Sequence, residues 1–542
     1  MQSQCSRSAD DRQQGAPLDV VEAWTGQNAS ALKRAFRDTN EGFAGRLGTS
    51  VRTVAAWSAN PQLIPTTEIQ RALDTLLFQA EDDVKVRFTL LVGNRPTGAS
   101  EQVATVRQTP AQQRLARDPH IAAALSWLES SFIWDPRSAR ELVAEELAAL
   151  DPRAVEAQAR RLAQVTRVQA AEATRRYYRA GFGQWRPYKA RLAEQVLATT
   201  ILTQDAWLDL EHDLGSGRGN FQFHPSVRRE INLSRRVAKE AARSLAESIE
   251  KGSQIVNAEI YSLTSLDVQR GVISGSVGVI DFVEFALTLN LLEGELMRSI
   301  ASEESSASPV MPIRSELLPD VAAVLDFSGR ICAGGALALT AIARPRGRGR
   351  DPDYLLLIQE RSGSVLNANQ RLAVIPKAFH GPMADYGEDA HFSATLEREM
   401  EEELFGRTDV DSTVSDQLHA DPMHPSLLSD PMRWLMDRQD SGAWRMESTA
   451  VGINLVSGNY EFANLIVIDD EEWWVKYGGQ VRANWESSGL HRYSSLDTAR
   501  LESLALDPRW SNEGLFAFTQ GCRRLAQIGG QRVRIPSIEL EF

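Results

Sequence analysis

One stretch decides how the C-terminal part of this chain is expected to fold: residues 395–406, Thr-Leu-Glu-Arg-Glu-Met-Glu-Glu-Glu-Leu-Phe-Gly. On a helix, Glu399, Glu402 and Glu403 lie three and four residues apart, so their carboxylates share one face. Carboxylates this close repel one another unless they are solvated, paired or bound to a cation, and oxygen ligands suit Mg2+ or Mn2+. Arg398 is placed to brace one of them by a bidentate contact. The alternative interpretation is a solvated acidic helix face.

These residues resemble the box of the Nudix family, which ends Arg-Glu-apolar-x-Glu-Glu-x-Gly. The resemblance implies a helix packed over a mixed sheet, with Mg2+ or Mn2+ as cofactor and water activated for attack on a diphosphate. It implies metal ligands at Glu399, Glu402 and Glu403, catalytic roles for Glu402 and Glu403, and structural support from Arg398.

The upstream half of the box departs from the family pattern. Ala384 and Ala390 stand where the family has a Gly and a Glu, and Phe405 takes the place of the last glycine, so that Gly406 comes one residue late. Residues 387–389, Gly-Glu-Asp, supply the missing acid only if residues are inserted. The altered upstream half favours ligand sensing, whereas the retained Arg-Glu-x-x-Glu-Glu favours hydrolysis.

The composition is that of a globular protein with several domains. A chain of 542 residues predicts about three domains, since one core rarely grows past about 250–300 residues. A formal charge of −13 argues against general polyanion binding and permits only a local basic patch. The three distant cysteines predict reduced thiols. Without a long apolar run or a signal-peptide core, we expect a cytoplasmic protein with no membrane partner.

The N-terminal region predicts three short helices, at residues 29–36, 40–47 and 50–59. Thr39 is the expected N-cap of the second helix, and Gly48 ends it where a left-handed residue is needed. Two short helices joined by a turn that contains glycine describe a helix-turn-helix.

Residues 32–57 look like the Xre/lambda-repressor-like helix-turn-helix family, in which the third helix enters the major groove by its N-terminal residues. By position, the resemblance implies DNA contacts at Arg46, Thr49, Ser50, Arg52 and Thr53. Local charge agrees, because residues 28–60 carry five basic and two acidic side chains, a net of +3. The alternative is a small helical bundle used for dimerisation or protein docking.

Hydrophobic periodicity predicts the remaining elements. Helices are expected at 65–90, within 120–178, and at 233–249, 281–299 and 512–526; strands are expected at 84–92, 197–203, 259–268, 271–279, 331–344, 353–360, 371–377, 450–456 and 463–469. A strand, a loop and then the glutamate helix is the order that the Nudix fold requires, so the context agrees with the motif.

These features together predict a multidomain α+β protein: an all-α helix-turn-helix, a helical and α+β middle region, and a C-terminal Nudix-like α/β/α sandwich. The predicted segments are a disordered tail (1–18), the helix-turn-helix domain (19–92), a linker (93–112), a helical region (113–184), an α+β middle domain (185–300), a second linker (301–314) and the Nudix-like domain (315–542).

Two functional hypotheses follow. The first is a DNA-binding transcriptional regulator, a homodimer on double-stranded DNA, whose Nudix-like domain senses a nucleotide or diphosphate-linked metabolite. The second is a Mg-dependent Nudix-type pyrophosphohydrolase of a nucleoside diphosphate-linked compound, with an accessory helix-turn-helix. An assay of turnover separates the two, because only the second hydrolyses its ligand.

Overall fold

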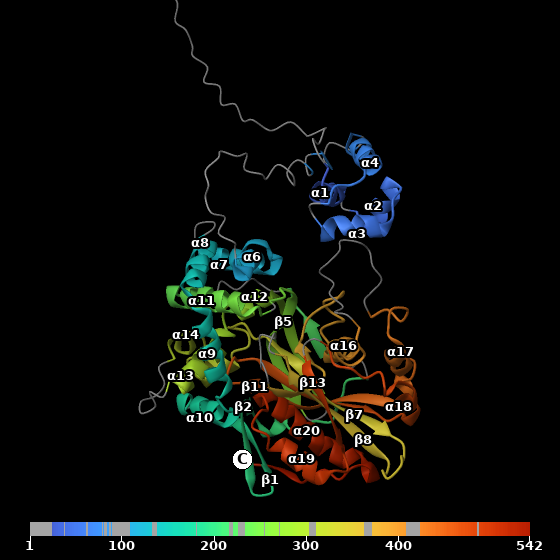
Figure 1. Cartoon of the computed structure of the whole chain (residues 1–542). Helices are drawn as coiled ribbons and strands as arrows, with labels where there is room; N and C mark the ends of the chain where they lie inside the picture. Colours follow the sequence, from blue (N-terminus) through green and yellow to red (C-terminus); the bar gives the residue numbers. More distant parts are fainter. Residues whose placement is uncertain are drawn as a thin grey trace, which may run out of the picture. The chain divides into compact units, whose positions relative to one another are not determined.

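The computed structural model divides the chain into two compact units, Met1–Val106 and Arg107–Phe542 (Figure 1). It describes residues 24–36, 38–60, 63–78, 80, 84–85, 88, 109–132, 138–179, 181–215, 220–225, 233–253, 255–269, 272–302, 311–362, 371–407, 423–484 and 487–541. The predicted tail 1–18 and most of the predicted linkers 93–112 and 301–314 lie outside these residues.

The smaller unit is helical, with α1 (Gly26–Phe36), α2 (Asn40–Leu47), α3 (Val51–Ala59) and α4 (Thr67–Phe78). These helices pack around a core that includes Leu32, Phe43, Val54, Trp57 and Leu73. The three helices predicted at the N-terminal end of the chain are therefore confirmed.

The strand predicted at 84–92 is wrong where the structure describes it. Val84, Lys85 and Phe88 are helical, and Val84 and Phe88 are buried in the core of the smaller unit. Their spacing of four residues satisfies the helical period, which the apolar run by itself did not distinguish from a strand.

The larger unit opens with helices α6 (Pro110–Arg117), α7 (Pro119–Ser131), α8 (Ser138–Ala149), α9 (Pro152–Ala163) and α10 (Arg167–Tyr177). The first of them begins inside the predicted linker 93–112, because the side chain of Thr109 and that of Gln112 form a reciprocal capping box. The end of that linker was therefore placed too late. A second capping box, formed by Thr166 and Gln169, starts α10.

Eleven strands of the described residues form one mixed sheet. The main path runs β13 (Ser487–Ser494), β8 (Asp353–Arg361), β7 (Gly334–Arg344), β12 (Tyr460–Ile468), β11 (Trp444–Asn454), β2 (Gln195–Thr203), β1 (Arg186–Leu192) and β14 (Ile538–Leu540). Three short strands pair beside this path: β3 (His212–Asp213) with β11, β9 (Leu372–Val374) with β8, and β10 (Lys377–Phe379) with β7. β7 and β12 are parallel, whereas their other main-path neighbours are antiparallel.

The sheet does not follow the predicted division at residues 301–314. β1 and β2 belong to the segment predicted as a middle domain, yet β2 pairs with β11, with Ile453 opposite Leu202. The strand predicted at 371–377 is two strands, β9 and β10, separated by a cis Ile375-Pro376 bond. Each of the two pairs with a different neighbour.

Helices cover both faces of this sheet. Successive side chains of β7 and β12 point to opposite faces, and on each face they join an apolar cluster that also contains helix residues. Leu337 and Leu339 lie in one cluster with residues of α20 (Asn512–Ile528), while Ala336 and Ala338 lie in the other with residues of α16 (Phe392–Glu399). Figure 1 shows α20 and α16 against the sheet within the larger unit. The chain is thus a mixed α/β protein, which agrees with the predicted α+β class in combining helices with sheets.

A second, three-stranded sheet contains β4 (Asn220–Phe223), β6 (Val272–Asp281) and β5 (Glu259–Gln269). The predicted hairpin of β5 and β6 is confirmed, as is the helix before it, α11 (Arg235–Lys251). The helix predicted at 281–299 is instead two helices, α12 (Phe282–Ala286) and α13 (Leu291–Ala301). The remaining helices are α14 (Pro312–Leu317), α15 (Val321–Leu325), α17 (Asp430–Met436), α18 (Glu471–Tyr477) and α19 (Thr498–Ala505). Within the described residues, none of the helices is long and apolar enough to cross a membrane.

Candidate functional site

Helices α2 and α3 are joined by a three-residue turn whose geometry is set by its caps. Thr39 accepts a hydrogen bond from the amide of Gly42 at the start of α2. Gly48 ends α2 with a φ of +64°, a conformation that favours glycine. The Ser50 hydroxyl accepts from the amide of Thr53 and so caps α3. The turn predicted from the sequence is present.

The five predicted DNA contacts lie around this turn. Ser50 and Arg52 are exposed, Thr49 and Thr53 are half-buried, and the Thr53 hydroxyl lies 2.8 Å from the Ser50 hydroxyl. Arg46 is exposed but is already engaged, because its guanidinium forms an ion pair of 2.5 Å with Asp38. Of the two arginines among the predicted contacts, Arg52 forms no ion pair with a carboxylate of the residues that the structure describes.

The glutamate stretch is α-helical only as far as Glu399. Met400–Leu404 forms a π-helical turn, in which the amide of Phe405 donates to the carbonyl of Met400. A π turn holds one residue more than an α turn. The turn ends at Gly406, whose φ is +71°, so the late glycine noted in the sequence fits the wider turn.

The three predicted metal ligands have separate surroundings. Glu399 is buried against Arg398, and Nε and Nη2 of Arg398 both lie 3.1 Å from its Oε1, so the contact is to one oxygen and is not the bidentate contact predicted. Glu403 is fully buried, accepts a hydrogen bond of 2.8 Å from the amide of Lys377, and lies 3.9 Å from Arg361. Glu402 is half-buried.

This arrangement does not fit a divalent ion held by all three glutamates. Among the residues that the structure describes, no three His, Cys, Asp or Glu side chains are placed to hold a metal ion. A divalent cation also needs carboxylate oxygens that are not taken by protein donors, whereas Glu403 already accepts from Lys377 and faces Arg361.

Of the two upstream acids that could complete the box, Glu388 is exposed and Asp389 holds its own loop. One carboxylate oxygen of Asp389 accepts from the amides of Met383, Ala384 and Asp385 at 2.7–2.9 Å. This bonding holds the irregular segment before α16 and leaves Asp389 committed to a structural role.

Lys377 joins the glutamate turn to a second group of charges. Its ammonium lies 2.5 Å from Oε1 of Glu513 at the start of α20. Burial opposes ionisation of Glu513, but Lys377 more than offsets it, and the pKa of Glu513 is lowered. Burial and the Glu513 charge instead raise the pKa of Glu461 well above its usual range and that of Glu293 to about 7.

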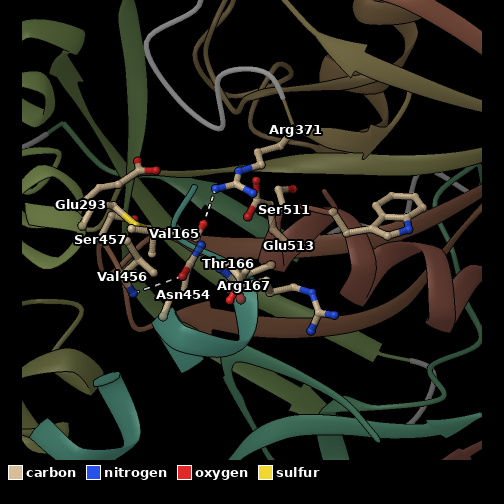
Figure 2. A pocket seen from close by; sticks show the side chains of 14 residues that line it. Val165, Thr166, Arg167, Glu293, Arg371, Asn454, Val456, Ser457, Ser511 and Glu513 are labelled. Carbon is tan, nitrogen blue, oxygen red and sulfur yellow. Dashed lines mark hydrogen bonds between the residues drawn. The ribbon is translucent and has the colours of Figure 1, made fainter. Parts of the chain in front are cut away.

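Beside Glu513 is a pocket that sequence reasoning missed (Figure 2). The hollow measures about 480 Å3, including solvent at its mouth, and it is lined by residues from α10, α13, the turn between β11 and β12, and the start of α20. Its charged side chains are Arg167, Glu293, Arg371 and Glu513. They come from four distant parts of the chain, so no local sequence motif could predict that they line one pocket.

No protein-family profile matches this chain, and no curated protein shows significant sequence similarity to it.

Proposed function

We propose that this protein is a DNA-binding transcriptional regulator whose larger unit binds a small ligand. The observation that carries the proposal is the α2–α3 pair, with a three-residue turn, both helices capped, and the N-terminal residues of α3 exposed. A helix presented in this way can enter a major groove by its first turn. Arg52 supplies charge for a phosphate contact there.

The structure supports the same role through charge and burial. Val54 and Trp57, on the opposite side of α3, are buried in the core of the smaller unit, which fixes the orientation of the helix. Besides the exposed apolar Val51, the exposed side chains at its start are the polar Ser50 and the basic Arg52, which suit contacts to phosphates and base edges. We also propose that the protein binds double-stranded DNA as a homodimer.

The ligand of the larger unit is proposed to be a nucleotide or a diphosphate-linked metabolite, on the resemblance of the glutamate turn to a Nudix box. Glu403 is buried and accepts a hydrogen bond from the backbone amide of Lys377. A carboxylate engaged in this way is poorly placed to bind a catalytic metal ion, which favours ligand sensing over hydrolysis.

Hydrolysis is the second candidate function, favoured by the contact between Arg398 and Glu399 that the resemblance implied. It would require Mg2+ or Mn2+ and a rearrangement of Glu403.

The DNA-binding proposal is tested with Arg52→Ala in the full chain, using genomic fragments selected for binding by the wild type. We expect weaker binding and a slope of log affinity against log salt that is smaller by about one. Arg71→Ala, an exposed arginine on α4, is the matched control. Equal binding by wild type and Arg52→Ala at low salt would contradict the proposal.

A further inference from the structure

The pocket beside Glu513 carries charges of both signs that are not neutralised by contact with one another. Glu293 on α13 and Arg371 before β9 reach into it from different sides (Figure 2). Each influences the ionisation of the other, yet the two form no ion pair within the described part of the chain. Buried or half-buried charges left apart in this way are costly unless a further group pairs with them.

Donors of both arginines remain available for such a group. One terminal nitrogen of Arg371, Nη2, donates to the carbonyls of Val165 and Ala163, at 2.5 and 3.3 Å. A guanidinium has five N–H donors, so these bonds fix its position and leave Nε and Nη1. Arg167 is 7% exposed and donates from Nη1 to Ala198, while its buried Nε has no partner among the described residues.

One of the two carboxylates of the pocket also lacks a hydrogen-bond donor among the described residues. Glu513 pairs with Lys377, whereas Glu293 accepts no hydrogen bond from any residue that the structure describes. Ser457, 4% exposed, adds a hydroxyl beside the carboxylates. The lining also includes the apolar side chains of Met297 and Val456.

We propose that this pocket binds a small zwitterion of amino-acid type, with its ammonium at Glu293 and its carboxylate at Arg371 and Arg167. Both charges of such a ligand meet an opposite charge of the protein, and its apolar part faces Met297 and Val456. The mouth of the pocket is open to solvent. The proposal is independent of DNA binding and of the glutamate turn.

The test measures binding of the twenty common L-amino acids to the full chain, by thermal unfolding and by calorimetry. We expect at least one of them to raise the unfolding midpoint. For that compound, the analogue without the amino group and the analogue without the carboxylate should each bind at least about tenfold more weakly, the equivalent of one lost pairing of about 1.4 kcal/mol. A panel without any binder would overturn the proposal.

Two variants locate the site. Glu293→Gln removes the charge at nearly constant shape and should weaken binding at least about tenfold, and Met297→Phe should narrow the pocket and weaken binding without altering a charge. Glu145→Gln, an exposed carboxylate in the middle of α8, is the matched control. Circular dichroism and the midpoint of denaturant unfolding confirm that each variant is folded. Unchanged amino-acid affinity in folded Glu293→Gln and Met297→Phe would place the ligand elsewhere and refute the assignment.

Discussion

Lys377 and Glu513 form a buried ion pair in which the ammonium lies 2.5 Å from a carboxylate oxygen, while the backbone amide of the same lysine donates to Glu403. One residue of a three-residue strand thus contacts both the glutamate turn and the start of α20. The ion pair also borders the pocket, since Glu513 is one of its lining residues.

Breaking this pair should destabilise the larger unit strongly. In Lys377→Met, Glu513 is left as a buried carboxylate without its cation, and we expect a loss of about 3–5 kcal/mol in the free energy of unfolding, measured by denaturant titration. The double variant Lys377→Met, Glu513→Gln should recover part of this loss, because no buried charge then lacks its partner. A single variant as stable as the wild type would show that the pair contributes little.

Ser50 caps α3 and is also a proposed DNA contact, and one substitution can separate the cap from the proposed contact. Aspartate is as good an N-cap as serine, so Ser50→Asp should leave the stability of the smaller unit within about 0.5 kcal/mol of the wild type. The same substitution places a negative charge at the start of α3, where a DNA phosphate would lie, and DNA affinity should fall at least about tenfold.

The variant Ser50→Ala serves as the comparison for Ser50→Asp, because it removes the cap without adding a charge. It should lose about 1 kcal/mol of stability through the missing cap while affecting DNA binding less than Ser50→Asp does. If Ser50→Asp and the wild type bind DNA equally well in electrophoretic mobility shifts, the start of α3 does not face the duplex.

The glutamate turn should show no hydrolysis in its present conformation. With a panel of nucleoside diphosphate compounds and Mg2+ or Mn2+, we expect phosphate and nucleotide release at the background rate, because Glu403 is buried and already accepts from Lys377. Turnover by the wild type that disappears in Glu403→Gln would support the hydrolase instead. Turnover that persists in Glu403→Gln would indicate a contaminating enzyme.

Glu293 should make stability depend on pH near neutrality. Burial and the nearby Glu513 charge raise its pKa from 4.5 to about 7, so the folded chain binds more protons than the unfolded chain between these values. The stability that this extra proton binding by Glu293 contributes to the folded chain is therefore fully present below about pH 4.5. It is lost as the pH rises through about 7. Between pH 5 and 8 the unfolding midpoint of the wild type should fall relative to that of Glu293→Gln. Parallel pH profiles of the two proteins would contradict the assignment.

Local elements were predictable because their signals are local. The cap at Thr39, the left-handed Gly48 and the hairpin of β5 and β6 all follow from neighbouring residues. The arrangement of the strands was not predictable in this way. The pairing of β2 with β11 joins residues about 250 positions apart, and nothing in the composition of either strand specifies its partner.

The candidate site shows the same limit. Arg398 was expected to contact one of the carboxylates, and it contacts its chain neighbour Glu399. It did not reveal that Met400–Leu404 widens into a π turn, because that depends on packing around the turn. The partners of Glu403 and Glu513 meet at Lys377 only through tertiary contacts.

The strand pairing also determines how this protein can be divided for experiments. A fragment that begins at residue 315 would lack β1, β2 and β3, so β11 would present unpaired backbone donors and acceptors along part of its length. Open edges of this kind recruit other chains and cause aggregation. Residues 107–542 should accordingly be produced as a single piece.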